Sequence, residues 1–93
     1  MARAQARHIL VQTEAECESI KQEILAGADF AEMAKQHSLC PSGAQGGDLG
    51  EFGRGDMVRE FDEVVFGGEL HTVHGPVKTQ FGYHLLEVTS RSD

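Results

Sequence analysis

The chain is poor in basic residues. Its 93 residues include only 8 Lys and Arg against 15 Asp and Glu, which gives a net charge of −7. The few basic residues form no cluster. Because nucleic acids and anionic membranes are recognised through concentrated positive charge, we expect neither as a main partner.

Long apolar runs are also missing. The sequence holds no run of about 18 apolar residues, so it predicts no membrane-spanning helix. The first ten residues, MARAQARHIL, lack the apolar core of an export signal. We therefore predict a cytoplasmic location, with a domain cut from a longer protein as the alternative. The length and the 40 % apolar content predict one folded domain over residues 1–93.

Cysteine is scarce. Cys17 and Cys40 match no metal or redox spacing, so we expect reduced thiols. His71 and His74 form an H-x-x-H pair that could be combined with His84 and Cys40 on paper. No second cluster supports such a site, and residues 71–74 are expected to form a loop, so we predict no metal centre.

Local signals predict the order of helices and strands. The capping boxes T-E-A-E at 13–16 and D-F-A-E at 29–32 each begin a helix, and Gly27 ends the first one. Hydrophobic periodicity predicts a third helix and four short strands. The third helix covers 58–66, and the strands cover 7–11, 49–52, 77–79 and 84–89. The order β-α-α-loop-β-α-β-β indicates an α+β fold with helices packed on a small sheet.

Two histidines fall on predicted strands. Alternation along a strand places His8 on the same face as Leu10, and His84 on the same face as Leu86. We therefore expect the two imidazoles to lie side by side if the first and last strands pair.

A glycine-rich segment separates the second and third helices. Its glycines are Gly43, Gly46, Gly47, Gly50, Gly53 and Gly55. A phosphate-binding loop is excluded because no G-x-x-x-x-G-K-[ST] pattern is present. We interpret the segment as a tight path that brings backbone close to a bound chain, with a plain surface loop as the alternative.

Apolar residues accompany this segment, and Leu49, Met57 and Phe81 among them lie at the ends of predicted elements. Leu49, Met57, Phe61 and Phe81 predict a small apolar cup with Cys40 and histidine at its edge. A thiol hydrolase that uses Cys40 and a histidine is the alternative, although the local sequence offers no oxyanion hole.

These motifs together resemble the parvulin-type peptidyl-prolyl isomerases, most closely the small stand-alone bacterial parvulins of the PpiC type. The resemblance covers almost the whole chain in order. It is carried by H-I-L-V at 8–11, G-A-D-F at 27–30, C-P-S-G at 40–43, G-G-D-L-G-E-F at 46–52, F-D-E-V-V-F at 61–66 and G-P-V-K-T-Q-F-G-Y-H at 75–84. It implies a four-stranded, mainly antiparallel sheet surrounded by helices. It also implies isomerisation of X–Pro bonds in polypeptides, which assists their folding. We expect a monomer that requires no cofactor, because rotation about a peptide bond breaks no bond.

The resemblance also implies roles for individual residues. Its catalytic set maps onto His8, Cys40, Thr79 and His84. Its proline pocket maps onto Leu49, Met57 and Phe61, with Phe81 at the rim.

Two features set the chain apart within this resemblance. Arg59 and Glu60 stand in a segment where close relatives often carry a proline. The chain also lacks the basic insert that phosphate-directed members carry after the first strand, so no phosphate specificity is expected. The alternative to turnover is a module that only binds proline-containing segments.

Overall fold

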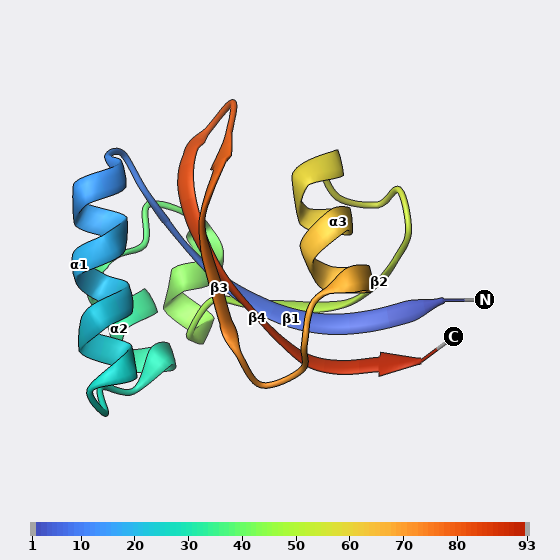
Figure 1. The fold of residues 1–93 in the computed structure, drawn as a ribbon, viewed down its shortest axis with the longest axis horizontal. Coiled ribbons are helices and arrows are strands. Elements are labelled where there is room, and N and C mark those ends of the chain that lie inside the picture. Colours follow the sequence, from blue (N-terminus) through green and yellow to red (C-terminus); the bar gives the residue numbers. More distant parts are fainter. Residues whose placement is uncertain (1, 93) are drawn as a thin grey trace.

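The first and last strands of the chain pair at the centre of one antiparallel sheet (Figure 1). The computed structural model describes residues 2–92. Its elements are β1 (Arg3–Val11), α1 (Glu14–Leu25), α2 (Phe30–His37), the short 3-10 helix η1 (Pro41–Gln45), β2 (Asp48–Gly53), α3 (Arg59–Gly67), β3 (Val73–Thr79) and β4 (Gly82–Ser92). The strand order is β2-β1-β4-β3. The predicted α+β fold and element order are thereby confirmed.

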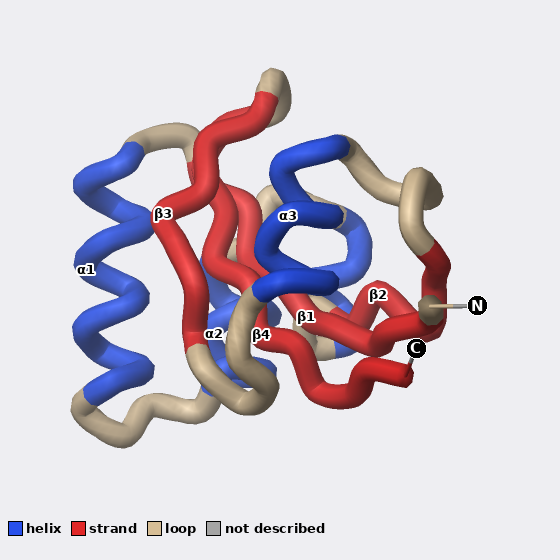
Figure 2. The backbone as a smooth tube through the Cα atoms, turned by 45° about the vertical axis from the view of Figure 1, so that its right-hand side comes forward, coloured by secondary structure: helices blue, strands red, loops and turns tan. Residues whose placement is uncertain are grey.

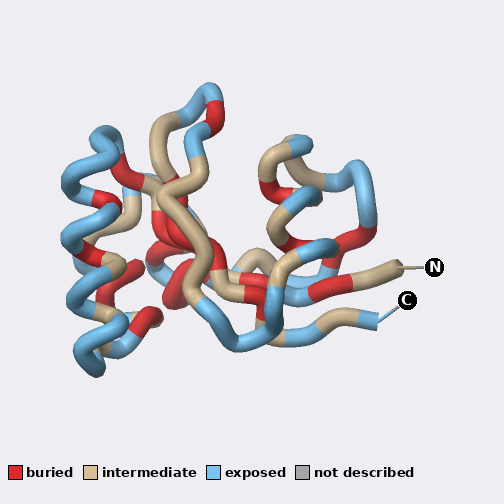
Figure 3. The backbone as a smooth tube through the Cα atoms, in the orientation of Figure 1, coloured by how far each residue is buried: buried red, intermediate tan, exposed pale blue. Residues whose placement is uncertain are grey.

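Helices cover both faces of this sheet (Figure 2). α1 and α2 pack on one face, where Ile9, Val11 and Leu85 from the strands meet Ile20 and Phe30 from the helices. α3 packs on the opposite face over a second cluster. That cluster consists of Ala4, Ala6, Phe52, Val65 and Val88. Buried positions accordingly concentrate along the strands and on the inner sides of the helices (Figure 3).

Both predicted helices begin at the predicted N-cap residues, Thr13 and Asp29. The Glu16 backbone N–H donates to Thr13 Oγ1 over 3.1 Å, and the Glu32 backbone N–H donates to Asp29 Oδ2 over 3.1 Å. Each cap satisfies a backbone donor that the first turn of a helix leaves without a partner, so each fixes where its helix begins.

The strands are longer than the sequence predicted, and one prediction is wrong. The supposed loop at 71–74 ends early, because Val73 and His74 belong to β3 and pair with Glu87 and Leu86 of β4. These residues carry no strong local strand signal. Pairing with β4 recruits them, and such long-range pairing is invisible in local sequence patterns.

The glycine-rich segment approaches the protein's own sheet. The His8 backbone N–H donates to the Gly47 carbonyl over 2.9 Å. Gly47 has a φ of 86°, and a Cβ at this position would overlap the His8 carbonyl oxygen. Glycine is required here because the backbone of the loop is in direct contact with the backbone of β1 at His8.

Candidate functional site

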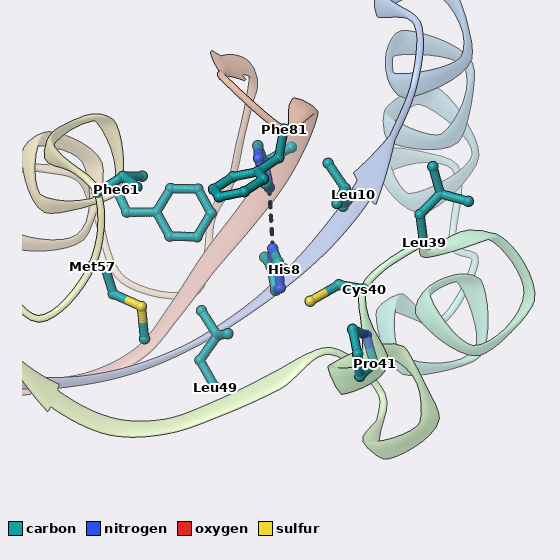
Figure 4. Close-up of a pocket in the computed structure, with 11 residues that line it drawn as sticks. His8, Leu10, Leu39, Cys40, Pro41, Leu49, Met57, Phe61 and Phe81 are labelled. Atoms are coloured by element: carbon teal, nitrogen blue, oxygen red, sulfur yellow. Dashed lines mark hydrogen bonds between the residues drawn. The ribbon is translucent and has the colours of Figure 1, made fainter.

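A cavity of about 400 Å³ opens on the α3 face of the sheet (Figure 4). Its lining residues are His8, Leu10, Leu39, Cys40, Pro41, Leu49, Met57, Val58, Phe61, Phe81 and His84. Every predicted site residue except Thr79 is among them. The structure therefore brings together residues that lie up to 76 positions apart in the chain.

The predicted apolar cup forms one side of this cavity. Leu49 comes from β2, Met57 from the loop before α3, and Phe61 from the first turn of α3 (Figure 4). Phe81 lies in the turn between β3 and β4 and is 61 % exposed, as expected for a residue at the rim.

The loop that carries Met57 is held by two carboxylates. The Gly53 backbone N–H donates to Asp56 Oδ2 over 2.8 Å, and the Gly55 backbone N–H donates to Asp62 Oδ2 over 2.8 Å. These bonds fasten the loop to itself and to α3, so the cup wall is positioned before a ligand arrives.

The two histidines lie next to each other beneath the cup, as the strand alternation predicted. In the β1–β4 pairing His8 is opposite Leu86, and Leu10 is opposite His84. The imidazoles are therefore diagonal neighbours, with their Nδ1 atoms 3.2 Å apart. The ring of Phe61 meets both edge-on, at centroid distances of 4.7 Å from His84 and 5.5 Å from His8.

Both outer ring nitrogens are also engaged. His84 Nε2 lies 2.7 Å from Thr79 Oγ1, which in turn accepts the Phe81 backbone N–H over 3.1 Å. His8 Nε2 lies 3.1 Å from Ser42 Oγ. A continuous chain of hydrogen bonds thus runs from Thr79 through both rings to Ser42.

Burial keeps the two imidazoles neutral. Burial, and to a smaller extent the neighbouring His84, lower the pKa of His8 to about 4. Burial likewise lowers the pKa of His84 to about 4, although the negative charge of Glu60 opposes that effect. A neutral ring carries one N–H, and a single proton lies between the two Nδ1 atoms. The hydrogen bonds that link Thr79, His84, His8 and Ser42 therefore all have the same donor-to-acceptor direction, either toward Ser42 or toward Thr79.

Cys40 enters the cavity from the loop before η1 (Figure 4). Its backbone N–H donates to Ser38 Oγ over 3.3 Å, and its carbonyl accepts the Gly43 N–H over 2.9 Å. The four ring nitrogens of His8 and His84 already have other partners, so neither imidazole is free to act as a base toward the thiol. This geometry disfavours the thiol-hydrolase alternative.

Cys17 has a structural role. It lies on the buried side of α1 and is 1 % exposed, and burial raises the pKa of its thiol to about 11. A thiol in this environment is inert toward nucleophilic chemistry.

The sequence reasoning missed several lining and supporting residues. Ser42 stands inside the C-P-S-G motif, where only Cys40 had been singled out. Leu10 shares a strand face with His8, so alternation alone could have placed it in the cavity. Leu39, Pro41 and Val58 had no signal of their own, because only the chain path brings them to the opening.

The H-x-x-H pair does not contribute to a site. His74 Nε2 bonds to the Glu69 carbonyl over 2.9 Å, and His71 is exposed. Within residues 2–92, no group of three or more His, Cys, Asp and Glu side chains could hold a metal ion. Over the same residues, no helix has the length and apolar character needed to cross a bilayer.

A family model described as the PPIC-type PPIase domain, or rotamase, matches residues 3–90. Among curated proteins, the chain is 48 % identical over 90 residues to the foldase protein PrsA of Halalkalibacterium halodurans. That alignment covers 96 % of this chain but only 27 % of PrsA. The chain thus spans between a quarter and a third of the length of the foldase proteins that it matches.

Solved structures are also similar to the chain over almost its whole length. The crystal structure of the peptidylprolyl isomerase PrsA from Bacillus anthracis superposes with a TM-score of 0.95 at 38 % identity, covering 99 % of this chain and 43 % of that one. The solution structure of NmPin, the parvuline of Nitrosopumilus maritimus, gives a TM-score of 0.86 at 31 % identity, covering 97 % and 98 %. The solved NmPin chain is therefore of about the same length as this chain.

Proposed function

This chain belongs to the PpiC-type peptidyl-prolyl isomerase family, and we propose that it accelerates cis/trans rotation about X–Pro bonds in the cavity above the two histidines. The observation that carries the proposal is an apolar cup, formed by Leu49, Met57 and Phe61, directly above a buried pair of neutral imidazoles. The substrates are extended or unfolded polypeptides, and assistance to folding is the expected consequence.

Rotation requires no bond to be broken. Amide resonance imposes a barrier of ~18–20 kcal/mol. The uncatalysed X–Pro step therefore takes roughly 10–100 s. The planar amide is strongly dipolar, whereas the twisted transition state is less so. An apolar, desolvated cavity therefore favours the twisted state relative to the planar one.

The cup and the polar centre divide this task. Leu49, Met57 and Phe61 hold the proline ring, which fixes one side of the bond while the other side turns. His8, His84 and Cys40 supply a polar surface next to the rotating carbonyl, and Thr79 bonds to His84 from outside the cavity lining. A decrease in the barrier of ~4–5 kcal/mol gives about 10³–10⁴-fold acceleration.

The decisive experiment is a protease-free isomerisation assay on a panel of X–Pro peptides. Phe61→Ala removes one wall of the cup and should lower kcat/KM by at least about tenfold, on the scale where ~1.4 kcal/mol is a factor of ten. Leu25→Ala is the matched control, because Leu25 is 61 % exposed at the end of α1 on the opposite face of the sheet. If the chain binds the peptides but does not accelerate their cis/trans exchange, it is instead a module that only binds proline-containing segments.

We also propose that the site has no preference for phosphorylated substrates. The cavity lining holds no Lys or Arg among residues 2–92, and the net charge of −7 repels an added anion. A several-fold preference for a phosphoserine–Pro peptide over the unmodified peptide would contradict this.

A further inference from the structure

Acidic residues gather at the start of α3, next to the cup, and they differ in whether they have partners. Asp62 Oδ2 accepts the Gly55 backbone N–H over 2.8 Å. Glu63 Oε1 lies 3.8 Å from Arg59 Nε, on the exposed side of the helix. Glu60 takes part in no ion pair within residues 2–92. Its carboxylate is therefore available to a cation from outside the chain.

Glu60 lies at the edge of the cavity, although it is not part of the lining. Val58 and Phe61, which precede and follow it at the start of α3, both line the cavity. Glu60 is half-buried, and its negative charge acts against the burial that lowers the pKa of His84. Because Coulomb forces decline with distance and are screened by water, this coupling indicates that the carboxylate is on the side of α3 that faces the histidines.

The proline ring in the cup determines which part of a substrate comes near Glu60. In Figure 4, Met57 and Phe61 stand on one side of His8, whereas Cys40 stands on the other. The rotating bond joins the ring to the residue before it, so that residue lies over the imidazoles and away from the cup. The residue after the proline is attached to the ring itself. It therefore begins on the side of the cup, next to the start of α3.

We propose that Glu60 is a specificity-determining residue, which binds a basic side chain in the position directly after the proline. The inference rests on the proposed isomerase function. Among residues 2–92, the cavity lining includes no Lys or Arg that would repel this cation. A lysine or arginine of the substrate can lay its methylene stem along the apolar rim while its charged head reaches the carboxylate. Because water reaches one side of the pair, its contribution is modest.

The test uses three peptides that differ only in the residue after the proline, which is Lys, Gln or Glu. The unmodified chain should isomerise the Lys peptide with a kcat/KM about three times that of the Gln peptide, mainly through a lower KM, and the Glu peptide should be the poorest. Glu60→Gln removes the charge at nearly constant shape, so the ratio of the Lys to the Gln value should fall to about one. Glu63→Gln is the matched control, because it makes the same substitution on the same helix at a side chain that is 69 % exposed. It should keep the ratio of the unmodified chain.

Ionic strength provides a second measurement. An increase from about 0.05 M to about 0.5 M salt should lower the ratio of the Lys to the Gln value in the unmodified chain and leave it unchanged in Glu60→Gln. Glu60 also stands in the first turn of α3, where a negative charge stabilises the helix. A loss of folded protein would reduce activity on all three peptides alike, so the ratio separates substrate binding from this structural effect.

Three results would overturn the role of Glu60. They are a ratio of about one in the unmodified chain, a ratio that Glu60→Gln leaves unchanged, and a ratio that Glu63→Gln lowers as much as Glu60→Gln does. The last result would show an effect of net charge rather than of a defined contact. If the unmodified chain isomerises none of the three peptides, the proposed function itself has failed.

Discussion

The buried histidine pair predicts how folding stability depends on pH. The reference pKa of 6.5 applies in the unfolded chain, whereas the folded-state pKa of each ring is about 4. Between these values the unfolded chain binds protons that the folded chain excludes. The contribution of the pair to the free energy of unfolding is therefore largest above pH 6.5, falls as the pH is lowered toward 4, and levels off below it.

The size of this effect follows from the two pKa values. Protonation equilibria with pKa values of about 4 and 6.5 lower the stability by about 2 kcal/mol for each ring between pH 7 and pH 5. The first proton on the pair is opposed mainly by burial. The second would set two N–H donors against each other across the 3.2 Å contact between the Nδ1 atoms.

The assay is urea unfolding at a series of pH values for the unmodified chain, for His84→Asn and for His71→Asn. His71 is exposed with a φ of 59°, a conformation that asparagine tolerates, so the second variant removes a histidine without touching the pair. His84→Asn should show a smaller decrease in stability between pH 7 and pH 5, and His71→Asn should behave as the unmodified chain. Parallel pH profiles for all three proteins would refute the reasoning.

Four further outcomes are expected. Cys40→Ser should keep most activity in the isomerisation assay, with a loss of at most ~1–2.5 kcal/mol in kcat/KM. A folded variant that loses ~4 kcal/mol or more would instead favour a covalent mechanism through Cys40. Ser42→Ala should lower stability by about 1–3 kcal/mol in urea unfolding, because His8 Nε2 loses its partner, and Ser42→Thr should restore part of it. Gly47→Ala should destabilise by at least about 2 kcal/mol, because of its φ of 86° and the overlap with His8, and an unchanged unfolding midpoint would disprove this close approach. Activity per folded molecule should be almost flat in isomerisation assays between about pH 5.5 and 8, since neutral rings do not titrate there, whereas a pH–rate step near 6.5 would indicate acid–base catalysis.

The foldase proteins PrsA that the chain matches are about three times longer than the chain or more. We propose that the domain supplies the isomerase step wherever it is joined to other segments. The cytoplasmic location and the monomeric state stay predictions. Size-exclusion chromatography of the 93-residue chain tests the second of these.

The sequence alone was sufficient for features that depend on near neighbours. The caps at Thr13 and Asp29 were predictable because each side chain bonds to a backbone group three residues away. Strand alternation predicted the faces that His8 and His84 occupy on their strands, and these form one face of the sheet. Family resemblance then indicated the cup residues, which the cavity lining contains.

Only the tertiary structure decided features that depend on distant partners. Pairing with β4 drew Val73 and His74 into β3, although their local sequence favoured a loop. Gly47 contacts the His8 backbone, and Ser42 bonds to the His8 imidazole. Both interactions join segments more than 30 residues apart. The path of the loop before η1 turned Leu39 into a wall of the cavity beside Leu10. Sequence periodicity reports which face a residue occupies, but the identity of the partner on that face is set by how the whole chain packs.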